Sequence, residues 1–236
     1  MRLSTKLEGW RIIVTGGSSG IGEATVEWLR DAGAFPIIFD RVIVHGGTKG
    51  YAVDVCDSEC VDNYVMRVAA GGPIDGLVTC AGVTSDAFLT EMTPDQFRGV
   101  IEVNLLGTFH AVQAVGKVMV EQQSGSIVTI SSLSAAGNKG QANYAASKAG
   151  VIALTNTAAL EWGRYGVRVN TILPGPVETP MLGTVPEKVL DGWIKATPLG
   201  HIATPVDIAN AVGFLLSDDA SHINGSQLTV SGGMRF

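Results

Sequence analysis

The feature that most constrains the fold is an alternation of short, continuous apolar segments with longer amphipathic stretches. The apolar segments are rich in β-branched residues and punctuated by glycine, and we expect strands at 11–16, 35–40, 50–55, 75–82, 125–132, 167–175 and 226–233. Amphipathic stretches such as 22–33, 142–163 and 204–218 lie between them. Continuously apolar strands suit a parallel sheet covered on both faces. The alternation therefore predicts an α/β fold, a doubly wound parallel sheet of the Rossmann type with about seven strands and helices on both faces.

The chain is predicted to form one domain over residues 1–236, because it contains no internal repeat and no low-complexity linker. One connection is unusually short, since only residues 41–50 lie between the second and third strands. A parallel crossover usually needs a dozen or more residues, most of them helical. We therefore expect a loop or a single turn there.

The composition is apolar for a lone soluble chain, with 46% hydrophobic and only 16% charged residues. Soluble monomers rarely expose large apolar patches, which favours a homo-oligomer. The net charge of −6 and the absence of like-charge blocks argue against nucleic-acid and anionic-membrane partners. No apolar segment reaches the length of a signal peptide or a membrane span, so we expect a cytoplasmic protein without a membrane partner.

The three cysteines are an odd number, which argues against a full disulfide framework. Cys56 and Cys60 are four residues apart, but no second pair of ligands accompanies them. We therefore expect no metal site.

A glycine-rich turn, TGGSSGIG at 15–22, follows the first expected strand and opens the first helix. Gly16 permits a tight turn, Gly20 lets the backbone approach a ligand, and Gly22 lets helix and strand pack closely. The free N–H groups of the helix would then bind a pyrophosphate. The spacing is G-x-x-x-G-x-G rather than G-x-G-x-x-G, and an ordinary strand-to-helix loop is the alternative.

Asp40 ends the second expected strand, where a carboxylate can accept hydrogen bonds from the adenosine ribose hydroxyls. The same charge would repel a 2′-phosphate, because two unit charges about 4 Å apart interact by roughly 4 kcal/mol at an effective dielectric of 20. Arg41 acts in the opposite sense, since a guanidinium can hold a phosphate. We expect NAD rather than NADP, and a simple turn cap is the alternative role for Asp40.

Tyr144 and Lys148 are four residues apart and would share one face of a helix. A phenol with a pKa near 10 is a poor acid–base group at neutral pH. A nearby lysine and the positive ring of an oxidised nicotinamide would lower that pKa. The pair follows ISS at the carboxyl end of a strand, where ligands bind in such sheets.

Together these motifs resemble those of the short-chain dehydrogenase/reductase family, over almost the whole chain. The resemblance rests on TGGSSGIG, Asp40, DV at 54–55, AG at 81–82, NLLG at 104–107, GSIVTISS at 125–132, YAASK at 144–148 and PGPVETPM at 174–181. GNKGQANYAASKAG and the ending LTVSGGMRF look most like the β-ketoacyl-carrier-protein reductase branch.

The resemblance implies four catalytic residues. Tyr144 is the acid–base for the substrate oxygen, and Lys148 binds the nicotinamide ribose and lowers the tyrosine pKa. Ser132 hydrogen-bonds the substrate oxygen, and Asn104 holds a water in the proton relay.

It also implies a set of residues that bind the nicotinamide cofactor, among which Val177 and Thr179 would hold the carboxamide. The expected cofactor-binding residues are Thr15, Gly16, Ser18, Ser19, Gly20, Ile21, Gly22, Asp40, Arg41, Asp54, Val55, Cys80, Ala81, Gly82, Tyr144, Lys148, Pro174, Gly175, Val177 and Thr179.

Two departures from the family pattern concern the site. The usual Asn-Asn-Ala-Gly is TCAG here, with Cys80 interpreted as a packing residue rather than a reactive thiol. Counting back from Tyr144 selects Ser131 as the catalytic serine, whereas matching the strand selects Ser132. Loops absorb deletions more readily than strands do, so we favour Ser132.

Residues 181–201 are expected to form a substrate lid, and plain packing is the alternative for their apolar side chains. We expect an NAD-dependent oxidoreductase that interconverts a secondary alcohol or diol and a ketone, because Asp40 favours oxidation. The alternatives are an NAD(P)H-dependent reductase of 3-oxoacyl thioesters and a nucleotide-binding regulator on the same fold. The resemblance implies a tetramer, with the helices of Asn104 and Tyr144 paired across one interface.

Overall fold

The computed structural model describes residues 7–43 and 48–235 and contains one seven-stranded sheet in which every neighbouring pair is parallel. The strand order is β3-β2-β1-β4-β5-β6-β7, which is a doubly wound arrangement. The strands are β1 Arg11–Thr15, β2 Phe35–Asp40, β3 Gly50–Ala52, β4 Gly76–Thr79, β5 Gly125–Ile130, β6 Val167–Pro174 and β7 Gln227–Val230. All seven expected strands are confirmed; β2 has the expected bounds, and the other six are shorter than expected.

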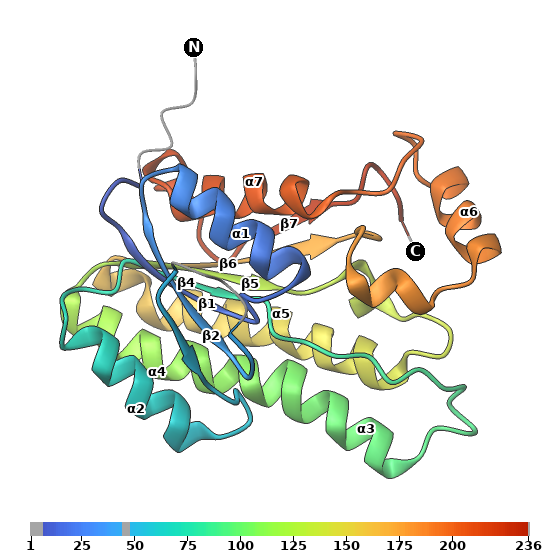
Figure 1. Cartoon of the computed structure of the whole chain (residues 1–236), viewed down its shortest axis with the longest axis horizontal. Coiled ribbons are helices and arrows are strands. Elements are labelled where there is room, and N and C mark those ends of the chain that lie inside the picture. Colours follow the sequence, from blue (N-terminus) through green and yellow to red (C-terminus); the bar gives the residue numbers. More distant parts are fainter. Residues whose placement is uncertain (1–6, 44–47, 236) are drawn as a thin grey trace.

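Helices cover both faces of the sheet (Figure 1). On one face, α1 packs over β1 and β2 and α7 packs over β5 and β6, through a cluster that includes Ile12, Leu29 and Val212. On the other face, α2, α4 and α5 pack through a cluster that includes Ile13, Val65 and Val115. The longer helices are α1 Gly20–Asp31, α2 Ser58–Ala69, α3 Pro94–Ile101, α4 Gly107–Gln122, α5 Ala142–Trp162, α6 Glu187–Ala196 and α7 Pro205–Leu216.

Short helical turns complete the fold, and one of them interrupts a long helix. The π-helical turn η1, Glu102–Leu106, joins α3 to α4 without a break in helical backbone angles. The other short turns are the 3₁₀ helices η2 Leu133–Ala136, η3 Gly163–Tyr165, η4 Pro180–Thr184 and η5 Asp218–Ala220. Single π turns inside α-helices occur frequently at functional sites.

The connection between β2 and β3 follows the expectation of a loop as far as it is described. Residues 41–43 and 48–49 contain no helix, and residues 44–47 lie outside the described part of the chain. Ile43 packs on the buried face of β2, and a methyl group added at Gly50 would lie 3.0 Å from its side chain. Within the described residues, Ile43 therefore covers apolar surface that a crossover helix would cover.

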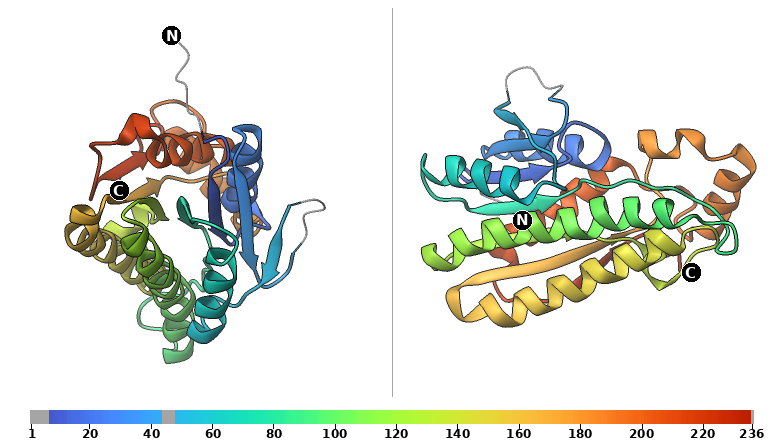
Figure 2. Two further views of the ribbon diagram at one scale, coloured as in Figure 1. Left: turned by 90° about the vertical axis from the view of Figure 1, so that its left-hand side faces the viewer. Right: turned by 90° about the horizontal axis from the view of Figure 1, so that it is seen from below.

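A row of threonines crosses the centre of the sheet. Thr15, Thr79, Thr129 and Thr171 are registered neighbours on β1, β4, β5 and β6, and all four are buried. Thr15 and Thr79 are the last residues of their strands, so the row lies close to the carboxyl edge of the sheet. α6 stands apart from the sheet at one end of the molecule in both orientations (Figures 1 and 2).

Candidate active site

The segments expected to form the site meet at the carboxyl edge of the sheet. The glycine loop follows β1, Asp40 ends β2, residues 80–82 follow β4, Ser132 follows β5, and residues 175–179 follow β6. This edge of a doubly wound sheet is where ligands bind.

The glycine loop is packed so tightly that side chains are excluded at two positions. Gly16 has φ +65°, and a Cβ added there would lie 2.6 Å from the backbone nitrogen of Ala81. A Cβ at Gly22 would lie 2.1 Å from the carbonyl oxygen of Gly16. The glycines therefore let the loop approach both the end of β4 and the start of α1.

The start of α1 has features that fit a dinucleotide pyrophosphate. Ser19 precedes the helix and makes no side-chain cap hydrogen bond, so the N–H groups of the first turn remain available to a ligand. The Ser18 hydroxyl is buried without a partner among the described residues. Buried hydroxyls normally have partners, and a phosphate oxygen would supply one.

Asp40 makes a structural contact at the expected ribose position. Its Oδ2 accepts a hydrogen bond of 3.1 Å from the Ser18 backbone N–H, as the turn-cap interpretation predicts. Among the described residues, its Oδ1 has only a long contact of 3.5 Å with the Val42 N–H, which leaves acceptor capacity for a ribose. Arg41 is exposed, and its charge acts on Cys56, in the loop after β3.

The segment after β3 forms the next part of the expected adenosine site. Asp54 Oδ1 accepts 2.9 Å from the Cys56 N–H, and Val55 is buried against Gly107. Burial, with help from the Asp54 carboxylate, raises the pKa of Cys56 to about 11. This thiol therefore stays protonated at neutral pH.

Tyr144, Lys148 and Ser132 come together as predicted. The Lys148 Nζ lies 5.6 Å from the centre of the Tyr144 ring, and the Ser132 hydroxyl is close enough to the phenol to lower its pKa. The Lys148 ammonium is buried and donates 2.8 Å to the Ile130 carbonyl at the end of β5. Strand β5 and helix α5 thus place these three side chains together.

The two candidate serines have different surroundings. Ser131 is 2% exposed, and its hydroxyl donates 2.8 Å to the Lys148 carbonyl. Ser132 is partly exposed, accepts 3.1 Å from the Ser134 N–H and reaches the Tyr144 phenol. These contacts favour Ser132 as the serine that meets a substrate and give Ser131 a structural role.

Asn104 lies in the π turn η1 and is completely buried. Its Oδ1 accepts 2.8 Å from the Val83 N–H, and its Nδ2 donates 3.0 Å to the Val83 carbonyl and 3.1 Å to Ser147 Oγ. Both amide hydrogens are used by the protein. The expected water-holding role of Asn104 therefore stays a prediction, and the contacts give it a second role in fixing the loop after β4.

The pKa of Tyr144 differs from the sequence-based expectation. Burial raises it, the Ser132 hydrogen bond lowers it, and the Asp86 carboxylate raises it again, so that the net direction is upward. Burial also lowers the pKa of Lys148 to about 8. Since the chain's own groups disfavour the phenolate, the expected lowering stays a prediction for the protein with an oxidised nicotinamide bound.

The TCAG departure gives a buried Thr79 and a half-buried Cys80, neither with a strong polar partner among the described residues. Cys80 packs against the core beside α1, and burial raises the pKa of its thiol to about 12. The Thr79 hydroxyl is buried with no hydrogen-bond partner in the described part of the chain. These properties agree with the interpretation of Cys80 as a packing residue.

The segment after β6 returns to the glycine loop. Gly175 donates 3.0 Å to the Val230 carbonyl, and Val177 is buried and bridges to Ala203. A methyl group added at Gly20 would lie 3.2 Å from Thr179 Cγ2. Residues 175–179 therefore lie beside the start of α1, as a cofactor-binding segment would.

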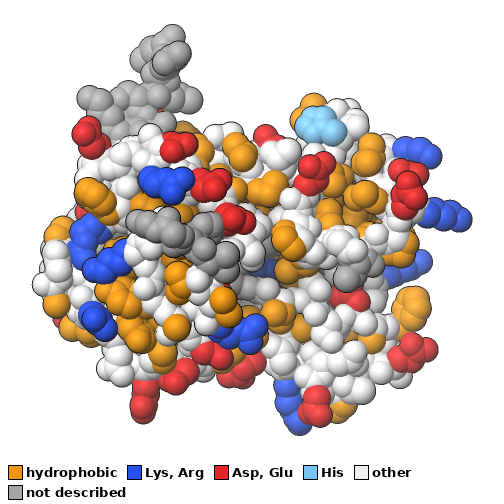
Figure 3. All heavy atoms as spheres, viewed as in Figure 1, with side chains coloured by type: hydrophobic (Ala, Val, Ile, Leu, Met, Phe, Trp, Pro, Cys, Tyr) orange, Lys and Arg blue, Asp and Glu red, His pale blue; other side chains and the backbone are white. Residues whose placement is uncertain are grey.

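The expected lid, residues 181–201, contains η4 and α6 and stands off the main body (Figure 2). No residue of α6 is fully buried, and Met181, Val189 and Leu199 are exposed. Hydrophobic side chains gather around α6 on the face drawn in Figure 3, where charges of both signs are interspersed elsewhere. Core packing is therefore not the main role of this segment in the single chain.

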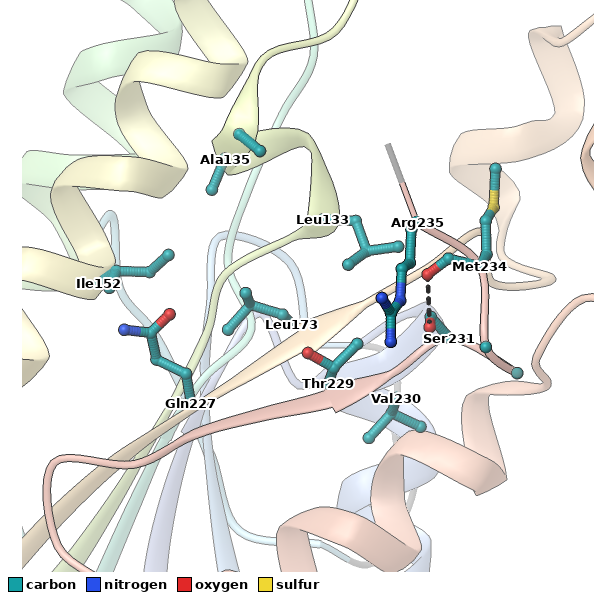
Figure 4. Close-up of a pocket in the computed structure, with 13 residues that line it drawn as sticks. Leu133, Ala135, Ile152, Leu173, Gln227, Thr229, Val230, Ser231, Met234 and Arg235 are labelled. Carbon is teal, nitrogen blue, oxygen red and sulfur yellow. Dashed lines mark hydrogen bonds between the residues drawn. The ribbon is translucent and has the colours of Figure 1, made fainter. Parts of the chain in front are cut away.

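A hollow of about 880 Å³ lies next to the site but does not contain the catalytic side chains (Figure 4). Its lining includes Leu133, Ile152 and Leu173, with β7 and Arg235 on the other side. Leu133 immediately follows Ser132, so the hollow adjoins the site behind η2.

Three residues near Tyr144 were not singled out from the sequence. The Gln141 Nε2 donates 3.0 Å to Asp86 Oδ2, and the amide of Asn143 bonds to the segment after β4. Asn143 directly precedes Tyr144, but a buried asparagine at a helix start has no distinctive sequence signal. Only the fold brings residues 85–86 to the start of α5.

Two other properties concern ligands and membranes. Among residues 7–43 and 48–235, no group of three or more His, Cys, Asp or Glu side chains is arranged to hold a metal ion, and all three cysteines are free. In that same part of the chain, no helix has the length and apolar character required to span a bilayer.

The parallel sheet, the glycine loop and the Ser–Tyr–Lys constellation define a nicotinamide-dependent oxidoreductase. The sequence profile of the family described as enoyl-(acyl carrier protein) reductase matches residues 16–235. The chain belongs to the short-chain dehydrogenase/reductase family and is an oxidoreductase that interconverts a secondary alcohol and a ketone with a nicotinamide cofactor.

Similar proteins include two enzymes that are named for thioester substrates. The chain is 40% identical over 256 residues to human (3R)-3-hydroxyacyl-CoA dehydrogenase, covering 99% of this chain and 98% of the relative. It is 38% identical over 243 residues to 3-oxoacyl-[acyl-carrier-protein] reductase from Thermotoga maritima, covering 97% and 99%. The crystal structure of levodione reductase superimposes with a TM-score of 0.91 at 33% identity, covering 96% and 97%.

Proposed function

We propose that this protein is an NAD-preferring dehydrogenase of a secondary alcohol or diol, with Tyr144 as the acid–base. The observation that carries the proposal is the placement of the Tyr144 phenol, whose ring centre lies 5.6 Å from the buried Lys148 ammonium and whose pKa the Ser132 hydroxyl lowers. A phenol held by a hydroxyl and flanked by a cation can exchange a proton with a bound alcohol oxygen.

In the proposed mechanism, Ser132 and Tyr144 both hydrogen-bond the substrate oxygen. As the alcohol is oxidised, Tyr144 accepts the hydroxyl proton; in the reverse direction it returns that proton to the ketone oxygen. Lys148 supports the phenolate by its positive charge and binds the nicotinamide ribose. The nicotinamide, when bound, supplies the hydride acceptor or donor.

The cofactor would be held by the set of residues expected from the sequence. The glycine loop and the start of α1 would bind the pyrophosphate, and Asp40 would bind the adenosine ribose through its spare acceptor capacity. Residues 175–179 would hold the nicotinamide end. Residues 181–201 would close over the substrate as a lid.

The NAD preference is tested by titrating the purified protein with NADH and with NADPH at fixed ionic strength and following nicotinamide fluorescence. We expect NADH to bind at least tenfold more tightly, which is about 1.4 kcal/mol. Tighter binding of NADPH would mean that Arg41 outweighs Asp40, and the cofactor proposal would be wrong.

A second function, reduction of 3-oxoacyl thioesters, is favoured by the two thioester enzymes among the similar proteins. The two functions separate when initial rates are measured with NAD plus 2,3-butanediol, NAD plus 3-hydroxybutyryl-CoA, and NADH or NADPH plus acetoacetyl-CoA. Tyr144→Phe should abolish every activity that the wild type shows. A protein that binds NADH but acts on none of these pairs would favour the regulator interpretation instead.

We also propose a cytoplasmic homotetramer in which α4 and α5 pair with the same helices of another subunit. Leu160 on α5 is 86% exposed, and it adjoins a hollow lined by Val120, Trp162 and Tyr165. Glu161 and Arg164 also line this hollow, and the exposed leucine beside it supports burial against a second copy.

A further inference from the structure

We propose that Asn143 is a positioning residue for Tyr144: its buried amide fastens the first turn of α5 to the segment between β4 and α3. The inference rests on the proposed acid–base role of Tyr144. We refer to the set of hydrogen bonds made by the Asn143 side chain as the Asn143 latch.

The Asn143 latch joins three parts of the chain. Its Nδ2 donates 2.9 Å to the Ser85 carbonyl and 3.1 Å to the Gln96 carbonyl in α3. Its Oδ1 accepts 2.7 Å from the Tyr144 N–H. The residue is 0% exposed, so these bonds do not compete with water. Both amide hydrogens and the oxygen of the side chain are used.

The start of α5 depends on this latch because the usual cap is missing. Gln141 precedes the helix and makes no side-chain cap hydrogen bond. Its amide instead donates 3.0 Å to Asp86 Oδ2 and accepts 2.9 Å from Asn138 Nδ2. The first N–H groups of a helix have no carbonyl partner within the helix, and the Asn143 side chain satisfies that of Tyr144.

The segment after β4 is itself held firmly, so it can act as the fixed side of the latch. Val83 is bound twice by Asn104, and Ala87 donates 2.9 Å to the Gly140 carbonyl. Two buried asparagines on different helices, Asn104 and Asn143, thus hold the same segment at Val83 and Ser85. The first turn of α5, which carries the Tyr144 phenol, is therefore fixed relative to this segment.

The consequence for the chemistry is geometric. The Tyr144 phenol must stay within hydrogen-bond reach of Ser132 and of a substrate oxygen, roughly 2.6–3.2 Å. Without the latch, the Tyr144 N–H and two carbonyls lose their partners, and the first turn of α5 can shift. A misplacement of about 1 Å can cost on the order of 100-fold in rate.

The test compares Asn143→Ala with a matched control, Asn170→Ala. Asn170 is also 0% exposed and ties two segments together, donating 2.8 Å to the Ile223 carbonyl and accepting 2.9 Å from the Ser226 N–H. It lies in β6 and contacts none of the proposed catalytic residues in the hydrogen bonds above. Both variants therefore lose a buried asparagine that joins distant segments.

Three measurements are made on each full-length protein: hydrogen–deuterium exchange by mass spectrometry, NADH affinity by fluorescence, and kcat with NADH plus acetoacetyl-CoA. For Asn143→Ala we expect faster exchange in both 84–97 and 141–148, unchanged NADH affinity, and kcat lower by about tenfold or more. For Asn170→Ala we expect faster exchange only around 168–172 and 221–227, with unchanged kcat.

The proposal is overturned if Asn143→Ala leaves the exchange of 84–97 unchanged, or if both variants lose kcat equally. Should Asn143→Ala fail to fold, Asn143→Asp keeps the shape and the acceptor but loses the donors, and the same criteria apply to it. If the wild type is inactive on acetoacetyl-CoA, that result counts against thioester reduction. Hydrogen–deuterium exchange needs no substrate, so the exchange comparison would still decide whether the Asn143 latch holds the two segments together.

Discussion

At the scale of single residues, the site is governed by what surrounds the Tyr144 phenol. Burial and the Asp86 carboxylate raise its pKa, and among the described residues only the Ser132 hydroxyl opposes them. An enzyme that needs the phenolate for alcohol oxidation therefore depends on positive charge from Lys148 and the oxidised cofactor. The exposed Asp86 carboxylate opposes these positive charges, because its negative charge disfavours the phenolate.

Replacing this carboxylate should change the pH dependence of oxidation. The Asp86 charge raises the pKa of Tyr144, so Asp86→Asn should lower that pKa. Because oxidation uses the deprotonated phenol, the rate rises with pH through this pKa, and the rising limb should move to lower pH. The profile of kcat/KM against pH with NAD and an active alcohol measures the shift.

Asp95→Asn is the matched control for this prediction. The Asp95 side chain is 95% exposed, contacts Arg98, and is not among the groups that shift Tyr144. Its profile should coincide with that of the wild type. Equal profiles for all three proteins would show that Asp86 does not act on the acid–base group.

The threonine row offers a second residue-scale prediction, on stability. The Thr79 hydroxyl is buried and has no partner in residues 7–43 and 48–235, whereas Thr129 Oγ1 lies 2.7 Å from Thr155 Oγ1. An apolar isostere removes the cost of an unpaired group, so Thr79→Val should raise the free energy of unfolding by about 1 kcal/mol. Thr129→Val should lower it by a similar amount, because Thr155 loses its partner.

Urea unfolding at one protein concentration measures both changes, since assembly makes apparent stability concentration-dependent. If Thr79→Val is destabilising, the hydroxyl must have a partner such as an ordered water. Thr79 stands where the family usually has an asparagine, so the comparison also tests whether its hydroxyl has a hydrogen-bond partner there.

At the scale of elements, the sequence predicted what depends on local pattern. Seven apolar segments became seven strands, and the glycine spacing located the start of α1 within two residues. Tyr144 and Lys148 share a helix face because i and i+4 always do. These features are encoded within short windows, where apolar patterning and backbone freedom decide the outcome.

The features that escaped prediction depend on contacts between distant segments. The π turn at 102–106 has no local sequence signal, yet it carries Asn104 to Val83. The partners of Asn143 are backbone carbonyls 58 and 47 residues away in the chain. Backbone acceptors are the same for every residue type, so the sequence alone cannot indicate which carbonyl a buried amide will meet.

The junction of the glycine loop and α1 gives a prediction at this scale. A methyl group at Gly22 would lie 2.1 Å from the Gly16 carbonyl oxygen, so Gly22→Ala must displace the loop. We expect NADH affinity, measured by fluorescence titration, to fall at least tenfold, or about 1.4 kcal/mol.

Gly99→Ala is the control, because a methyl group there meets nothing within 4 Å and Gly99 lies inside α3. It should bind NADH as the wild type does and raise the free energy of unfolding by roughly 0.5–1 kcal/mol, as alanine favours a helix over glycine. Unchanged NADH affinity in Gly22→Ala would mean that the loop does not form the cofactor site.

At the scale of the whole molecule, the single chain leaves apolar groups on its surface that a soluble protein usually buries. Leu160 is 86% exposed, at the end of α5 that lies furthest from Tyr144. The adjacent hollow of about 540 Å³ lies near the C-terminal ends of α4 and α5. A second copy pairing its α4 and α5 here would cover Leu160 and brace the helix that carries Tyr144 and Lys148.

This pairing predicts that Leu160→Glu dissociates the assembly, because a carboxylate buried without a partner opposes association. Light scattering coupled to size-exclusion chromatography should give a mass below that of the wild type. Met66→Glu, a matched change at a residue that is 62% exposed on α2, should leave the wild-type mass unchanged. If Leu160→Glu keeps the wild-type mass, α4 and α5 do not form the interface. Loss of activity together with mass would show that assembly supports the active site, since Leu160 is remote from the chemistry.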